Sequence, residues 1–282
     1  NVLGDPVELL VDEDASEEAI ALIRAQYGLD RPLYVRFGEF YANLATLDFD
    51  TSLRHRIPAR EIVFRMLPNT AVLALVAWGI GIVGVPLGML AARRPRGFVD
   101  RIVNILSFAV ISIPEFWLGL VLILLLAVQA DILPTSGFAG LGPSGWLYLV
   151  LPALTLSPRV IGRNAQITRA TMIEEMGKQY VATARAKGLA ENKVLYAHVL
   201  KNAAISIVTL MGDELAGFMN GATAVEIIFG WPGLGKLLVD GITARDLPVV
   251  TASVFIIALM VMAINLLVDL IYTWLDPRVS YK

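Results

Sequence analysis

Hydrophobic residues occur along the chain in stretches long enough to cross a lipid bilayer. A spanning helix needs about 20 mostly apolar residues, and windows that meet or approach this length are residues 69–92, 102–130, 146–173, 203–229 and 249–275. A helix-breaking proline interrupts the second window, and the third becomes more polar toward its end. The pattern predicts an all-α fold, a polytopic membrane helical bundle with five spanning helices.

Composition agrees with a membrane protein and excludes several kinds of site. The 282 residues are 56% hydrophobic and 17% charged, whereas soluble domains are about 45–50% apolar and about 25% charged. A net charge of -2 gives no general attraction to nucleic acid. The chain has no cysteine, and its two histidines, His55 and His198, are far apart. We therefore expect no metal site, no cofactor and no cysteine nucleophile.

Basic residues predict the orientation in the membrane, because Lys and Arg in short loops are retained on the cytoplasmic side. Residues 93–101 and 159–202 are rich in Lys and Arg, as is the C-terminal end, whereas residues 131–145 contain none and residues 230–248 contain two. The rule places residues 93–101, residues 171–203 and the C-terminus in the cytoplasm. Residues 1–68 are then expected outside.

The N-terminal region differs in character from the rest of the chain. Residues 1–68 are soluble-like and acidic, and residues 17–27 have the pattern of a short amphipathic helix that ends at Gly28. We interpret this region as an extracytoplasmic cap and residues 69–282 as the transmembrane domain. Because no hydrophobic stretch precedes the cap, we also expect a sixth spanning helix N-terminal to Asn1.

Two glycine motifs resemble nucleotide-binding loops but lack the necessary context. Gly79-Ile-Gly-Ile-Val-Gly84 lies inside an apolar window with no strand before it, so close helix packing is the better interpretation. Gly84 and Gly88 have the spacing of a helix-packing pair. Gly230-Trp-Pro-Gly-Leu-Gly-Lys236 carries Leu237 where a phosphate-binding loop needs Ser or Thr. We expect no ATP site on this chain.

Acidic residues within the apolar windows are candidates for a transport pathway. Glu115, Asp213 and Glu214 lie in predicted spans, where a charge is costly unless it faces protein or water. We assign them, with Glu226, to a polar pathway that accepts a positive group such as an α-amino group. The alternative is that Glu115 satisfies backbone freed by the preceding proline, or that the acids lie near a membrane interface.

Residues 171–203 interrupt the hydrophobic pattern with a basic, alanine-rich segment. Small residues precede Gly188, and helical spacing resumes at Val194, Leu195 and Val199. Glycine permits a turn, so the pattern predicts two cytoplasmic helices joined at Gly188. Such a projection is suited to a cleft in another protein. The alternative is an amphipathic helix lying on anionic lipid.

Several motifs resemble one family. Tyr180-Val-Ala-Thr-Ala-Arg-Ala-Lys-Gly188-Leu, followed by His198-Val-Leu-Lys-Asn202-Ala, resembles the EAA loop of permease subunits of binding-protein-dependent ABC importers. The dipeptide, oligopeptide and nickel branch, first-permease type, is the most similar form. Ser112-Ile-Pro-Glu-Phe-Trp117, Trp231-Pro-Gly-Leu-Gly235 and Asp246-Leu-Pro248 match the same family in order.

The resemblance implies a coupling helix that docks on a cytoplasmic ATPase. The implied coupling residues are Ala182, Thr183, Ala184, Arg185, Ala186, Lys187, Gly188 and Leu189. It further implies a bacterial cytoplasmic membrane, a homologous second permease subunit, two ATP-binding subunits, an extracytoplasmic substrate-binding protein, contact with membrane lipid, and no enzymatic chemistry on this chain.

The cargo is left open among related solutes. The resemblance favours di- or oligopeptides, with a nickel chelate, glutathione or another small solute as alternatives. A different class, a secondary transporter driven by an ion gradient, would be expected to show an inverted repeat or discontinuous helices around a midplane site, and no such internal symmetry is visible. An intramembrane hydrolase would need a nucleophile with its base, or a metal cluster, in the spans.

Overall fold

The computed structural model describes residues 31–275, so the helix predicted over residues 17–27 lies outside the described part. Every regular element between residues 31 and 275 is a helix, and one isolated bridge pairs Thr51 with Pro58. The all-α prediction is confirmed for this part of the chain.

The chain forms two compact units. The smaller contains residues up to Arg65 together with Leu237–Ile256, and the larger contains Met66–Lys236 together with the residues from Ile257 onward. The predicted division into an outer cap and a membrane domain concerns membrane topology and stays a prediction.

Asp246 organises the smaller unit. It directly precedes α13 (Leu247–Leu275) and accepts a hydrogen bond from the Ser52 hydroxyl at 2.5 Å. The backbone N–H groups of Leu53 and Arg54 lie 3.3 Å from the same carboxylate. A buried carboxylate before a helix start satisfies backbone donors that the helix leaves unpaired. Asp246 therefore joins segments almost 200 residues apart in sequence.

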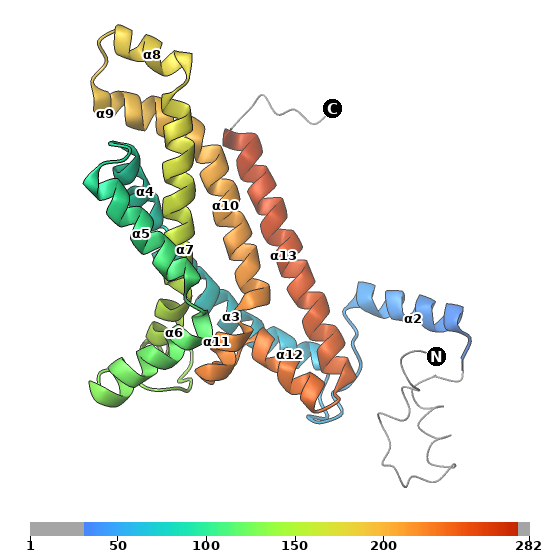
Figure 1. Ribbon diagram of the computed structural model, residues 1–282. Helices are drawn as coiled ribbons and strands as arrows, with labels where there is room; N and C mark the ends of the chain where they lie inside the picture. The colour runs from blue at the N-terminus through green and yellow to red at the C-terminus, as the bar shows by residue number, and fades with distance from the viewer. Residues whose placement is uncertain (1–30, 276–282) are drawn as a thin grey trace. The chain divides into compact units, whose positions relative to one another are not determined.

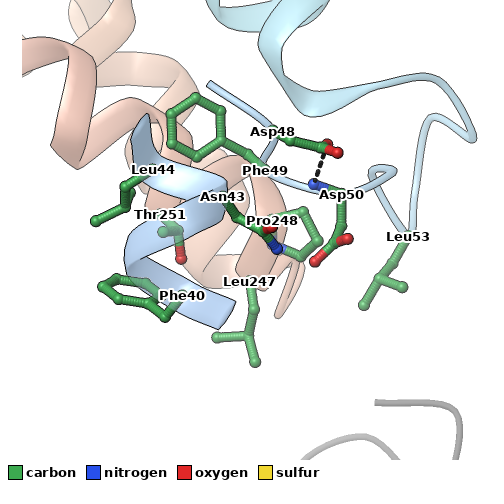
Figure 2. A pocket seen from close by; sticks show the side chains of 10 residues that line it. All are labelled: Phe40, Asn43, Leu44, Asp48, Phe49, Asp50, Leu53, Leu247, Pro248 and Thr251. Carbon is green, nitrogen blue, oxygen red and sulfur yellow. Dashed lines mark hydrogen bonds between the residues drawn. The ribbon is translucent and has the colours of Figure 1, made fainter. Parts of the chain in front are cut away.

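A small pocket of about 150 Å³ lies in the same unit, between α2 (Leu33–Thr46) and the first turns of α13. Figure 2 shows Phe40 and Leu44 of α2 near Leu247 and Pro248 of α13. Here α2 contributes an aromatic face, and none of its side chains is fully buried.

The larger unit is built on α7 (Trp146–Met176), against which α4 (Gly84–Ala92), α5 (Phe98–Ser112) and α10 (Leu200–Gly221) pack (Figure 1). At Gly84, a Cβ atom would lie 2.2 Å from the carbonyl oxygen of Ile161, and at Gly88, 2.4 Å from that of Ala165. The backbones of α4 and α7 therefore touch. The predicted packing role of Gly84 and Gly88 is confirmed.

One long helix, α3, and several shorter ones complete the described part of the chain. Those not yet given are α3 (Ala59–Gly81), α6 (Glu115–Leu122), η1 (Ile123–Gln129), α8 (Gln179–Ala186), α9 (Glu191–Lys193), η2 (Val194–Val199), α11 (Thr223–Ile228) and α12 (Leu234–Thr243). The chain bends by 95° between α5 and α6, because Pro114 cannot continue the first helix.

Helices suited to a membrane crossing overlap most of the predicted windows. Three described stretches are long and apolar enough, namely Ala59–Ala92, Glu191–Met219 and Leu247–Ile271, and the bent pair α5 and α6–η1 adds a fourth if it counts as one span. The window over residues 203–229 is corrected: α10 ends at Gly221 and a separate α11 follows. Helix α7 has 31 residues and is long enough to cross a membrane, but it is too polar to count among these apolar stretches.

Candidate functional site

The segment over residues 178–200, termed the coupling segment below, contains α8, a turn, α9 and η2. In Figure 1 α8 lies across the end of α7. The backbone of Gly188 has a φ of +75° with open space around it, a left-handed conformation that glycine adopts at little cost. The predicted pair of helices joined at Gly188 is confirmed.

Apolar side chains hold the inner face of α8. Val181 and Ala184 are buried in one cluster with Met172, Leu195 and Val199. Ala184, one of the implied coupling residues, is only 6% exposed, so its side chain belongs to the face that anchors α8. The exposed face consists of Ala182, Thr183, Arg185 and Ala186, followed by Lys187 and Gly188, with Leu189 half-buried.

Polar contacts anchor the start of α8. The Glu175 carboxylate accepts hydrogen bonds from Lys178 Nζ at 2.5 Å and from the Tyr180 hydroxyl at 2.6 Å. Burial opposes ionisation of Glu175, but the two hydrogen bonds and the charge of Lys178 outweigh it and lower its pKa. Burial and the bond to this carboxylate raise the pKa of Tyr180 to about 12. The carboxylate thus fixes both residues that lead into α8.

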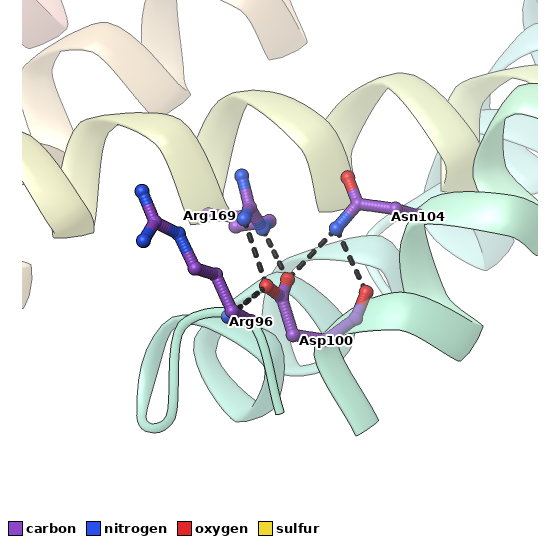
Figure 3. A network of polar contacts seen from close by, with 4 residues as sticks. All are labelled: Arg96, Asp100, Asn104 and Arg169. Atoms are coloured by element: carbon purple, nitrogen blue, oxygen red, sulfur yellow. Dashed lines mark hydrogen bonds and ion pairs between the residues drawn. The ribbon is translucent and has the colours of Figure 1, made fainter. Parts of the chain in front are cut away.

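A second polar network fixes the turn between α4 and α5 (Figure 3). Asp100 accepts two hydrogen bonds from the guanidinium of Arg169 on α7, from Nε and, at 2.8 Å, from Nη2. The Asn104 amide and the Arg96 backbone N–H each donate to it at 2.7 Å. Such paired bonds from a guanidinium are strong and directional. The turn is therefore tied to the helix that carries the coupling segment.

A charged cavity of about 310 Å³ lies between α6, α7, α10 and α13 in the larger unit. Glu115, Asp213 and Glu214 line it, and so do Arg159 and Arg163 of α7. Arg159 Nη1 donates to Glu115 Oε1 at 3.1 Å. Arg163 Nη1 lies 2.7 Å from Glu214 Oε1, an ion pair without hydrogen-bond alignment.

Neither arginine was among the predicted pathway residues. They lie inside α7, four residues apart, and therefore on one face of the helix. Asp213 is exposed to the cavity. The cavity therefore presents both signs of charge. The sequence did contain a signal for this arrangement: Arg159 and Arg163 are four residues apart within an otherwise largely apolar window.

Glu226, predicted to belong to the pathway, does not line this cavity. Its side chain is 0% exposed, and it accepts hydrogen bonds from the Thr70 hydroxyl at 2.7 Å and the Lys236 backbone N–H at 2.8 Å. Thr70 in turn accepts from the Leu234 N–H at 2.7 Å. A Cβ at Gly233 would lie 2.0 Å from the Glu226 carboxylate. Glu226 thus holds in place the loop over residues 230–236, whose glycine pattern resembles a phosphate-binding motif.

This helical architecture is shared with chains of solved ABC transporters. A chain of the MetNI methionine ABC transporter, in inward-facing conformations, matches with a TM-score of 0.61 and 20% identity over 76% of this chain and 96% of that one. An amino acid ABC transporter with histidines matches with a TM-score of 0.59 and 16% identity over 75% and 93%. At these identities the likeness establishes the fold.

Residues 84–281 match the family described as binding-protein-dependent transport system inner membrane component. The chain therefore belongs to this family of ABC importer permeases. It is a multi-pass inner-membrane transport subunit and not itself an enzyme. The name of the family implies that an importer of this kind works with a binding protein, and ABC transport implies an ATPase.

Curated relatives match almost the whole chain. The oligopeptide transport system permease protein AppB of Bacillus subtilis (strain 168) is 37% identical over 99% of this chain and 90% of its own length. A putative peptide transport system permease of Brucella abortus (strain 2308) is 39% identical over the same shares. The glutathione transport system permease protein GsiC of Salmonella typhi is 37% identical, again over 99% and 90%.

Proposed function

We propose that this chain forms part of the membrane pathway of an ATP-driven importer of di- or oligopeptides. The observation that carries the proposal is the cavity with charges of both signs. The permeases named above for oligopeptides, peptides and glutathione support a peptide-like cargo, because a free peptide carries an ammonium group and a carboxylate.

The cavity residues have different roles in this proposal. Glu115 and Glu214 each pair with one arginine and hold its guanidinium in place. Arg159 and Arg163 keep further N–H donors that suit a carboxylate. Asp213 is exposed to the cavity, so it suits the ammonium group. Glutathione, with two carboxylates, would depend more on the arginines than a simple dipeptide.

The proposed assembly follows the family. A homologous second permease subunit completes the pathway, two ATP-binding subunits bind the exposed face of α8 from the cytoplasm, and a substrate-binding protein delivers the cargo from outside. We further propose five spanning helices, with α7 as the third, residues 1–68 outside and the C-terminus inside. Helix α7 tolerates its arginines because they face protein and a polar cavity, where charge is less costly than in lipid.

Uptake by proteoliposomes that contain the assembled transporter tests the role of the cavity. Asp213→Asn should lower uptake of a dipeptide with a free ammonium group by about tenfold, because one charge contact to the cargo is lost. Uptake of the N-acetylated dipeptide should change little. Glu174→Gln, which removes an exposed acid outside the cavity, is the matched control. Equal uptake by the Asp213 and Glu174 variants would contradict the proposal.

The same vesicles test the class of transporter. Uptake should require ATP and the ATP-binding subunits. Uptake driven by an ion gradient without ATP would favour a secondary transporter. Saturable uptake of glutathione in preference to dipeptides would favour glutathione as the cargo.

A further inference from the structure

A second cavity, of about 320 Å³, lies beside the coupling segment. Its wall is mostly apolar and includes Met89 and Leu90 of α4, Met172 of α7 and Leu195 of η2. One charged side chain contributes to it, Arg93, which directly follows α4 and is exposed. An apolar interior with a cation at the open side fits a ligand that has an anionic head and a hydrocarbon tail.

The guanidinium of Arg93 is oriented but not neutralised. Its Nη2 donates to Asn192 Oδ1 at 2.7 Å, and its Cζ lies 5.9 Å from the ring centroid of Tyr196. No carboxylate lies within ion-pair distance of Arg93 among residues 31–275. Arginine has five N–H donors in a planar fork that matches phosphate. Most of these donors are therefore available to an anionic ligand.

The cavity lies at the level where two spans reach the membrane surface. Arg93 follows the last residue of the apolar stretch Ala59–Ala92, and Tyr196 lies near the start of Glu191–Met219. Lipid phosphates occupy this depth, just beyond the hydrocarbon core. Basic pockets between spans favour anionic headgroups, and Arg93 gives this cavity such a cation.

We propose that this cavity binds one anionic phospholipid, with its phosphate on Arg93 and part of an acyl chain against Met89, Leu90 and Leu195. A zwitterionic lipid offers the same chain without the net negative charge. A free phosphate ion offers the charge without the chain, and it would leave the apolar wall uncovered. The anionic lipid matches both halves of the cavity.

The proposed lipid would support the coupling segment from behind. Met172 and Leu195 line the cavity and also belong to the cluster that buries Val181 and Ala184 of α8. Filling the cavity therefore restricts movement of the wall on which α8 rests. The inference depends on the depth and chemistry of the cavity and is independent of which cargo the transporter carries.

Lipid retention by the purified full-length chain, measured by native mass spectrometry, tests the proposal. Phosphatidylglycerol should remain bound at one molecule per chain when phosphatidylcholine with the same acyl chains is lost. Arg93→Gln should weaken phosphatidylglycerol binding by about tenfold, because the charge-assisted hydrogen bonds to phosphate are lost. Arg94→Gln removes the adjacent cation, which is not part of the cavity wall, and should change binding by less than about twofold.

A third variant tests the hydrocarbon half of the site. Leu90→Trp fills the cavity without a change of charge and should also release the lipid, although Arg93 is retained. Equal retention of the two lipids by the wild-type chain would overturn the proposal, as would equal losses in the Arg93 and Arg94 variants. Displacement of phosphatidylglycerol by inorganic phosphate would identify a simple anion site and would also overturn it.

Discussion

Glu226 and Asp213 are two acids of the larger unit with opposite surroundings. Glu226 is buried and both of its oxygens accept hydrogen bonds, from Thr70 and from the backbone of Lys236. Asp213 faces a cavity together with Arg159 and Arg163. A buried carboxylate with satisfied oxygens stabilises a loop, whereas an exposed acid beside cations can contact a ligand.

Glu226→Gln should destabilise the protein by about 1–3 kcal/mol. One oxygen of the carboxylate is replaced by an amide NH₂ group, which cannot accept the hydrogen bond that it now receives. Thermal unfolding of the purified chain in detergent measures the loss, with Glu174→Gln, at an exposed acid, as the control. A change no larger than that of the control would mean that the network does not stabilise the loop.

Three of the charged residues that line the cavity could be predicted from the sequence. Glu115, Asp213 and Glu214 were found because a charge in an apolar window needs a partner or water. Arg159 and Arg163 were not assigned to the cavity, because a count of basic residues does not show that two of them share one face of a helix. The burial of Glu226 depends on Thr70, 156 residues away, a contact that no local pattern reveals.

At the scale of elements, the turn at Gly188 decides how α8 presents its outer face. A residue with a branched Cβ is strained at a φ of +75° by about 1–2 kcal/mol, whereas Asn adopts this conformation more readily. Gly188→Val should therefore raise the ratio of ATP hydrolysed to peptide imported in proteoliposomes, while Gly188→Asn should leave it close to the wild-type value. If both variants show the wild-type ratio of ATP hydrolysed to peptide imported, the geometry of this turn has no part in coupling ATP hydrolysis to transport.

The Glu175 carboxylate makes the anchoring of α8 dependent on pH. Because its pKa in the folded protein is lowered from the ordinary 4.5, its stabilising contribution is present above pH 4.5 and is lost as the pH falls through the lowered value. Hydrogen exchange of residues 178–190, corrected for intrinsic rates, should show reduced protection as the pH falls below 4.5. Glu175→Gln should abolish this step, and Glu174→Gln should retain it. A step that persists in Glu175→Gln would assign it to another group.

The sequence predicted the positions of helix breaks where a single residue type determines the backbone conformation. The bend at Pro114 and the turn at Gly188 were predicted because proline and glycine restrict the backbone locally. The end of α10 at Gly221 was missed, since residues 203–229 are apolar across the break between α10 and α11. The burial of Ala184 was not predicted, because a small side chain gives no signal for which side of a short helix is buried.

At the scale of the whole molecule, the number of spans depends on α7. The chain contains no cysteine, so single cysteines can be introduced on both sides of this helix. Thr135→Cys and Lys187→Cys are at exposed positions. If α7 crosses the membrane in the proposed orientation, an impermeant maleimide added to intact cells should label Thr135→Cys, and Lys187→Cys should react only after the cells are opened.

The outcome separates two topologies. Labelling of both cysteines from outside would place the coupling segment on the wrong side for an ATPase and would contradict the proposed coupling. Protection of both until the cells are opened would mean that α7 does not cross the membrane. Labelling tests the crossing more directly than hydropathy, because Arg159 and Arg163 line a cavity and Arg169 pairs with Asp100, so these charges need not face lipid.

The glycine contact between α4 and α7 has a mechanical consequence. Two backbones in direct contact at Gly84 and Gly88 leave no flexible side chains between them to absorb a displacement. If α8 couples to an ATPase as proposed, a displacement of α8, at the end of α7, should reach α4 with little attenuation, and α4 and α7 should move together. Bending of the bundle would then take place elsewhere. The sharp bend at Pro114 is a suitable hinge, because the helical hydrogen bonds are already broken there.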